Sequence, residues 1–342
     1  MVQPVTVGLD IAKNAFHAFG VDARGEKVVS RKLRRAQVEV FFAKLEPCLI
    51  GIEACATAHH WARTFAAMGH EVRLMPPAYV KPYVKTQKND EADAEAICEA
   101  VSRPNMRFAE IKTVDQQSVL VLHRTRTMLI KHRTRMGNTI RAHLAEFGIT
   151  EIIGREGLAR LIKLIVAGED TRITGITRRA MMCLVEQYRL LQEQILDLDC
   201  QVMAWHRSSE ASKRLATIPG VGPLAASALV ATVGDVSGFK NGRSFAAFIG
   251  LVPRQSSSGG KERLGKISKR GDNYLRWLLV VGSLAVIRYA QRHGSKRPWL
   301  VKLLQRRTTK IAAVAMANKI ARIAWVLMAR GGAYREPVAQ AV

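Results

Sequence analysis

Four acidic side chains lie within six residues of a strongly basic chain, at Asp90, Glu91, Asp93 and Glu95. The chain holds 53 Lys and Arg residues against 28 Asp and Glu, so an acidic cluster is unusual here. If the acidic segment 88–95 is helical from residue 90, Asp90 and Asp93 share one face. Two carboxylates on one face either bind a hard divalent cation or simply favour the start of a helix.

Two further acids each follow an apolar run that is typical of a buried strand. Asp10 ends the run 5–10, and Glu53 follows the run 48–52. Ligands gather at the carboxyl ends of strands in α/β sheets. Acids converging from strands and a helix suit phosphoryl transfer with two divalent ions about 4 Å apart. They are costly to crowd without a cation, because like charges raise each other's pKa values. Taken singly, Asp10 is also interpretable as a turn residue and Asp90 as a helix N-cap.

The charge balance predicts a polyanionic partner. The net charge is +25 and the sequence pI is about 10.4. A basic surface attracts nucleic acid and releases its counterions on binding. A ribosome-like or membrane-surface protein has a similar composition and is the simpler alternative. The length of 342 residues allows two or three domains.

Cysteine usage and hydropathy favour a cytoplasmic protein without a membrane span. No signal-peptide run begins the chain. The apolar stretches 278–290 and 311–328 are interrupted by Arg288, Lys319 and Arg322, which predicts buried helices. The cysteines lack metal-binding spacing, which indicates reduced thiols, at Cys48, Cys55, Cys98, Cys183 and Cys200.

The N-terminal third alternates strand and helix patterns. Strands are predicted at 5–10, 15–21, 27–33, 48–52 and 71–75, and helices at 38–45, 57–68 and from 90 onward. This order predicts an α/β domain with a mixed sheet and helices on its faces.

Two long amphipathic helices are predicted next, at 114–147 and 177–206, on either side of a break at 168–174. They form either an antiparallel hairpin or a coiled coil between chains. A solvated spacer and a dimer contact are both compatible with this pattern.

A glycine-rich turn follows at 215–226. Gly220 and Gly222 lie between an apolar helix end and a new helix, a pattern that resembles a helix-hairpin-helix. Such a turn presents backbone N–H groups to DNA phosphates. A plain tight turn is the alternative.

A basic, hydroxyl-rich stretch at 248–276 is predicted to be a mobile loop that leads into a helix at 277–289. A flexible linker rarely carries so many cations between packed helices. A last helix is predicted at 299–328. The cations predicted to bind nucleic acid are Arg254, Lys261, Lys266, Lys269, Arg270 and Arg276.

Two motif sets resemble a known family. The acidic boxes are GLDIAK at 8–13, IEA at 52–54 and KNDEADA at 88–94, and the second set is GLVPR at 250–254, SG at 258–259, ISKRG at 267–271 and LR at 275–276. Together they resemble the DEDD transposases of the "one-ten" family of bacterial insertion sequences. The N-terminal domain of that family is similar to the RuvC resolvase and RNase H fold. The match covers nearly the whole chain in the family's order.

This resemblance implies a catalytic serine, and Ser258 occupies its place because Gly259 follows directly. Ser256 and Ser257 remain possible nucleophiles. The implied reaction is attack on a DNA phosphodiester through a covalent phosphoserine link, without ATP, and the chain has no Walker A motif. The metal ligands, for Mg²⁺ or Mn²⁺, would be Asp10, Glu53, Asp90 and Asp93.

The resemblance also implies partners. These are double-stranded donor and target DNA, a structured non-coding bridge RNA, and further copies of the chain in a dimer or tetramer. In such an oligomer one subunit's acidic site would meet another's serine. The expected organisation is a RuvC-like domain at 1–112, a coiled-coil region at 113–210, an all-α domain at 211–332 and a flexible tail at 333–342.

Two alternatives remain open on the sequence. One is a metal-dependent resolvase-type nuclease that cleaves DNA with water, with the serine loop acting only as a DNA clamp. The other is a basic nucleic-acid-binding protein without enzymatic activity.

Overall fold

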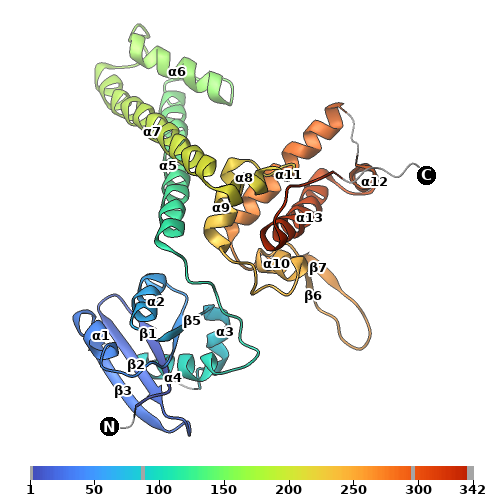
Figure 1. Cartoon of the computed structure of the whole chain (residues 1–342). Coiled ribbons are helices and arrows are strands. Elements are labelled where there is room, and N and C mark those ends of the chain that lie inside the picture. The colour runs from blue at the N-terminus through green and yellow to red at the C-terminus, as the bar shows by residue number, and fades with distance from the viewer. Residues whose placement is uncertain (1–2, 86–88, 294–296, 337–342) are drawn as a thin grey trace. The chain divides into compact units, whose positions relative to one another are not determined.

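The computed structural model describes residues 3–85, 89–293 and 297–336. The chain divides into two compact units, Met1–Val114 and Asp115–Val342 (Figure 1), each with its own hydrophobic core. Lys88 of the acidic segment lies outside the described residues, as does the predicted tail from 337 onward. The expected division of the second unit near residue 210 stays a prediction.

A five-stranded mixed sheet forms the centre of the N-terminal unit, in the order β3-β2-β1-β4-β5. β1 pairs with β4 and β4 with β5 in parallel, whereas β1, β2 and β3 pair antiparallel. The strands are β1 Thr6–Ile11, β2 Ala15–Val21, β3 Lys27–Arg34, β4 Leu49–Glu53 and β5 Glu71–Met75. The predicted α/β domain with a mixed sheet is confirmed.

Helices cover both faces of this sheet. Val7 and Leu9 point toward α1 and α2 and share a core with them. α4 packs on the opposite face, against β1, β2 and β4. The helical elements of this unit are α1 Arg35–Phe42, α2 Ala58–Ala67, α3 Pro77–Val80, the 3₁₀ turn η1 Lys81–Tyr83 and α4 Asp90–Val101.

Two glycines allow α4 to lie against the strands at backbone distance. A Cβ on Gly8 of β1 would collide with the backbone of Ala94 and Cys98. A Cβ on Gly51 of β4 would lie 2.8 Å from the Cβ of Val101. Both strands therefore need a residue without a side chain where the helix crosses them.

The second unit begins with an antiparallel helical hairpin. The indole N–H of Trp205 donates to the carboxylate of Asp115 at 3.2 Å, and Arg126 forms an ion pair with Asp199. These contacts join the first half of the first helix to the last third of the last one, which confirms a hairpin within one chain. The intervening helix was not predicted. The three helices are α5 Val114–Ala145, α6 Arg155–Ala167 and α7 Gly175–Ser208.

The remainder of the second unit is mainly helical, as predicted, with one short β-hairpin. The predicted single helix 299–328 is two helices, because Arg307 and Thr308 have extended backbones. The elements are α8 Glu210–Ala216, α9 Pro223–Val233, α10 Gly242–Phe248, β6 Pro253–Gln255, β7 Leu264–Ile267, α11 Asn273–His293, α12 Pro298–Arg306 and α13 Thr309–Arg330.

α13 is the one helix of the described residues that is long and apolar enough to cross a membrane by length and composition. Its inner face is buried against α11 and α10 in the core of the second unit. Burial of this kind is typical of a core helix, in line with the sequence prediction for 311–328.

A buried histidine joins α5 to the C-terminal helices. The Nε2 of His123 lies 3.1 Å from the hydroxyl of Ser227 on α9, and its Nδ1 lies 3.0 Å from the hydroxyl of Tyr274 on α11. The Ser227 hydroxyl donates to the Pro223 carbonyl at 2.7 Å, so it accepts from the imidazole Nε2–H. Burial, and then the charge of Arg126, lower the pKa of His123 to about 4.

We expect Gly8→Ala to lower the free energy of unfolding of the N-terminal unit by about 1–3 kcal/mol, because fixed backbone occupies the space that the methyl group needs. Urea unfolding of the full-length chain measures this. Gly175→Ala is the control, since an added Cβ there meets no atom within 4 Å. An unchanged urea midpoint for Gly8→Ala would contradict the close packing of α4.

Acid should weaken the second unit through His123. Its pKa is about 4 in the folded chain and 6.5 in the unfolded one, so between these pH values only the unfolded chain gains a proton. The free energy of unfolding should therefore fall by about 3 kcal/mol as the pH drops through that window. In His123→Gln, we expect this fall in the free energy of unfolding to be absent. Urea unfolding of both proteins from neutral to acidic pH measures it. Parallel pH profiles for the two proteins would refute the assignment.

Candidate active site

Asp10 and Glu53 lie at the carboxyl ends of two neighbouring parallel strands, Asp10 next to last in β1 and Glu53 last in β4. Leu9 of β1 is in register with Ile52 of β4, and each acid is the next residue along its strand. Each acid also lies two positions after the glycine that faces α4. Because side chains two apart on a strand share a face, both carboxylates lie on the face that α4 covers.

The start of α4 is set by Asn89. The side-chain oxygen of Asn89 accepts a hydrogen bond from the backbone N–H of Ala92 at 2.8 Å, which caps the helix. The interpretation of Asp90 as the N-cap is therefore wrong. Asp90 and Asp93 are in the first turn, three positions apart.

The two glutamates of this segment have cationic partners. Glu91 accepts hydrogen bonds from the ammonium of Lys27 at 2.8 Å and from the hydroxyl of Ser30 at 2.7 Å. These contacts, that of Lys27 first, lower the pKa of Glu91 to about 2. Glu95 pairs with Lys85 at 2.8 Å. Both glutamates thus tie α4 to neighbouring segments.

The two aspartates instead raise the pKa of Asp10. Burial, then the charges of Asp93 and Asp90, raise the pKa of Asp10 above its ordinary value, and the N–H of Ile11 and the charge of His17 offset this only in part. Within the described part of the chain, neither Asp90 nor Asp93 forms an ion pair. A bound cation would relieve this repulsion.

Two neighbours of the acids were not singled out in the sequence. The pKa of the Cys55 thiol is raised by burial and then by the charges of Glu53 and Asp10, so both carboxylates lie near this one side chain. His17 stands opposite Asp10 on β2. The sequence signal for Cys55 was its position two residues after Glu53. The signal for His17 was the pairing of β1 with β2, which places it opposite Asp10.

The oxygen donors fit a hard divalent ion. Among the described residues, no group of three or more His, Cys, Asp or Glu side chains lies close enough together to hold a metal ion. Asp10 and Glu53 lie on one face of the sheet, and the charges of Asp90 and Asp93 act on Asp10. Mg²⁺ suits this, since it is commonly held by one or two carboxylates together with waters and substrate phosphates.

Ser258 lies in the second unit, at the end of the β6–β7 hairpin. Its carbonyl accepts a hydrogen bond from the N–H of Lys261 at 3.1 Å. Gly259 and Gly260 between them have φ values of +56° and +76°, as a two-residue type I′ turn requires. The stretch predicted to be a mobile loop is thus a β-hairpin, because consecutive glycines allow the tight turn.

The three serines of the hairpin differ in their contacts. The hydroxyl of Ser257 accepts hydrogen bonds from the side-chain amide of Gln255 at 3.1 Å and from the N–H of Arg263 at 3.3 Å. Ser256 donates its N–H to the carbonyl of Arg263 at 3.0 Å. Ser258 is exposed, and no residue of the described chain hydrogen-bonds its hydroxyl.

Known proteins resemble this chain over almost its full length. The Transposase IS116/IS110/IS902 family model matches residues 212–297, and a second family model, described as a transposase, matches residues 7–149. A probable family 20 transposase of Pseudomonas aeruginosa is 46% identical over 96% of the chain and 98% of its own length. The chain belongs to the IS116/IS110/IS902 family of transposases.

Two further similar proteins are also transposases. The transposase for insertion sequence element IS1111A of Coxiella burnetii is 43% identical over 96% of this chain and 91% of its own length. The transposase for insertion sequence element IS1328 of Yersinia enterocolitica is 39% identical over 97% and 98%, respectively. The protein is thus an enzyme that cleaves and joins DNA strands, and the non-enzymatic alternative is set aside.

The family is also in keeping with the acidic face, the face of the sheet on which Asp10 and Glu53 lie beside the first turn of α4. The transposase carries a DEDD domain with an RNase H-like sheet, and such a domain implies a divalent metal ion. A transposase binds the DNA of its insertion sequence, in keeping with the net charge of +25.

Glycines also hold the serine hairpin of the transposase against α10. Gly250 has a φ of +80°, and a Cβ there would collide with the backbone of Arg270. Gly271 also has a φ of +80°, and its Cβ would collide with the Phe248 carbonyl. The N–H of Lys269 donates to the Gly250 carbonyl at 3.2 Å. The stretches 250–254 and 267–271 are therefore one packed unit.

Most of the predicted DNA-binding cations are exposed around this hairpin, but Arg276 is not. Its side chain is 8% exposed, and its guanidinium donates to the carbonyls of Ile249 at 2.7 Å and Arg270 at 3.2 Å. Arg276 thus supports the hairpin from α11 and is removed from the DNA-contacting set. The exposed cations are Arg254, Lys261, Lys266, Lys269 and Arg270.

The two glycines predicted to bind DNA have different surroundings in the turn before α9. Gly220 has a φ of +89° and packs on the backbone of Gly282 in α11, where its Cβ would lie 2.9 Å from the carbonyl oxygen. Gly222 is exposed and precedes Pro223, the first residue of α9. Gly222 is thus the more accessible of the two, whereas Gly220 closes the turn.

We expect Asp10→Asn to raise the melting temperature of the metal-free transposase by a few degrees, because it removes a half-buried charge beside two others. The same change should abolish the rise in melting temperature that Mg²⁺ or Mn²⁺ produces in the wild type. Scanning fluorimetry with and without EDTA measures both effects. Glu46→Gln, an exposed carboxylate of the same unit, is the control. A lower metal-free melting temperature with an intact metal response would contradict this.

Proposed function

We propose that this transposase breaks and rejoins DNA through a covalent bond between Ser258 and a DNA phosphate. The observation that carries the proposal is the place of this serine at an exposed two-residue turn. Its neighbour Ser257 has its hydroxyl engaged within the hairpin. Gly259 has no side chain, and the space beside it is open, since an added Cβ there meets no atom within 4 Å.

The proposed chemistry conserves phosphodiester bonds. The Ser258 oxygen attacks phosphorus, the bond from phosphorus to one deoxyribose oxygen breaks, and the serine proton passes to that oxygen. A hydroxyl of the partner strand then attacks the same phosphorus, and the serine hydroxyl is restored. One P–O bond forms for each that breaks, so no ATP is consumed.

We assign the metal ligands to Asp10, Glu53, Asp90 and Asp93. Their support is the repulsion at Asp10 and the two aspartates that have no ion pair among the described residues. When bound, Mg²⁺ or Mn²⁺ supplies positive charge to the phosphate oxygens during strand transfer. The four carboxylates would hold that ion, while Glu91 holds the helix in place through Lys27.

We further propose that a structured bridge RNA selects donor and target DNA and that the protein acts in the cytoplasm as a homo-oligomer, a dimer or a tetramer. The exposed cations of the hairpin and the high net charge support binding of RNA as well as DNA. Exposed apolar side chains on the outer surface of α7, Leu190 and Leu196, support association between copies.

The test is covalent trapping. Wild-type protein, Mg²⁺, bridge RNA and labelled DNA carrying the element ends should give a protein–DNA adduct that survives denaturing electrophoresis. We expect Ser258→Ala to reduce this adduct by roughly a thousandfold or more, as loss of a nucleophile does. Asp10→Asn should abolish it as well.

Matched controls come from the same hairpin. Ser256→Ala and Ser257→Ala should retain the adduct, because they leave the Ser258 hydroxyl in place. Free nicked DNA from Ser258→Ala, without any adduct in the wild type, would replace the serine mechanism with hydrolysis by a metal-dependent nuclease.

A further inference from the structure

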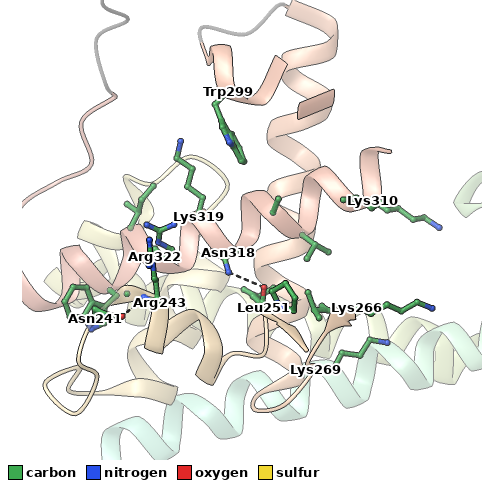
Figure 2. A pocket seen from close by; sticks show the side chains of 18 of the residues that line it. Asn241, Arg243, Leu251, Lys266, Lys269, Trp299, Lys310, Asn318, Lys319 and Arg322 are labelled. Carbon is green, nitrogen blue, oxygen red and sulfur yellow. Dashed lines mark hydrogen bonds between the residues drawn. The ribbon is translucent and has the colours of Figure 1, made fainter. Parts of the chain in front are cut away.

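A large groove in the second unit is not used by the chemistry described above. It has a volume of about 1590 Å³ and lies along the outer face of α13, bordered by α10, α12 and the β6–β7 hairpin. Figure 2 shows the groove with Leu251 and Asn318 at its base, where the Asn318 amide donates to the Leu251 carbonyl at 3.2 Å. The groove is open to solvent.

The floor of this groove is apolar. Ile311, Val314 and Ala315 follow one another at helical spacing along α13, and Ile311 is 51% exposed. Trp299 of α12 is 41% exposed and stands over one side (Figure 2). Exposed apolar surface collected in a concave site is typical of a binding site rather than of a solvated face.

The rim is positively charged on both sides. The lining residues include six cations and no acid, namely Arg243, Lys266, Lys269, Lys310, Lys319 and Arg322. Within the described residues, none of the six forms an ion pair. In Figure 2, Lys266, Lys269 and Lys310 extend to one side, and the other three lie together on the opposite side.

We infer that this groove binds unpaired nucleotides, with the bases on the apolar floor and against Trp299 and the phosphates along the basic rim. A duplex hides its base faces and would leave the apolar floor empty, whereas a single strand offers a base to each apolar contact. The Lys319 ammonium already lies 4.7 Å from the centre of the Trp299 ring, so a cation and an aromatic ring stand together at this side of the groove. The inference rests on the proposal that the protein works with DNA and a structured RNA.

Two other occupants fit less well. An anionic membrane is flat, while this floor is recessed between α10, α12 and the hairpin. An acidic amphipathic helix of a second copy would match the apolar floor. Its acidic residues, however, would lie on a single polar face, which cannot pair with the cations on both rims. A nucleotide strand carries a charge at every residue and therefore meets both rims.

The experiment measures binding of the full-length chain to fluorescent oligo(dT) and oligo(U) of about fifteen nucleotides, and to a duplex of equal charge. We expect Trp299→Ala and Ile311→Ser each to weaken single-strand binding roughly five- to fiftyfold. Duplex affinity should change less than about twofold, because phosphate contacts persist. Oligo(dT) and oligo(U) together show whether the groove prefers DNA or RNA.

Trp277→Ala on α11 is the matched control, since Trp277 is 52% exposed and is not part of the groove. It should leave single-strand affinity unchanged. The inference is overturned if neither groove variant weakens single-strand binding, or if both weaken duplex binding equally. It is also overturned if Ile311→Ser changes the oligomeric mass or the binding to anionic vesicles instead of nucleotide affinity.

Adduct formation at Ser258 separates this inference from the proposed function. If both groove variants keep wild-type oligonucleotide binding while the wild type forms the adduct, the inference alone is defeated. Nucleotide binding that depends on the groove, with no adduct in the wild type, defeats the serine mechanism alone.

Discussion

Close packing of α4 on the sheet is the constraint on which the acidic face depends. Gly8 and Gly51 carry no side chain at the crossing points, so the helix lies directly on β1 and β4. Asp10 and Glu53 follow these glycines by two residues and share their face. The same contact that packs the core therefore places the first turn of α4 beside the strand ends.

That placement concentrates negative charge beside the sheet. The acidic residues of α4 then have two different roles. Glu91 and Glu95 are neutralised by lysines and hold the segment in place. Asp90 and Asp93 act on Asp10 and raise its pKa. Sites that bind cations commonly sacrifice stability of the metal-free protein in this way. The two glutamates thus have lysine partners and the two aspartates act on Asp10, although all four are neighbours in sequence.

Backbone contact at glycine recurs in the second unit. Gly250 and Gly271 bring the two basic stretches of the hairpin together, and Gly220 joins its turn to α11. Arg276 completes the support with hydrogen bonds to two carbonyls. A rigid base of this kind lets a short hairpin hold an exposed serine at a defined position, which a flexible loop would not do.

The sequence by itself determined the order of strands and helices in the N-terminal unit, the acids at the strand ends and the family, because each rests on local periodicity and short motifs. Tertiary structure decided the rest. Only packing shows that Arg276 is buried and that Asn89 rather than Asp90 caps α4. The groove along α13 was equally hidden, because its floor and rims come from segments up to about eighty residues apart, from Arg243 to Arg322, and side chains so distant in sequence leave no common pattern.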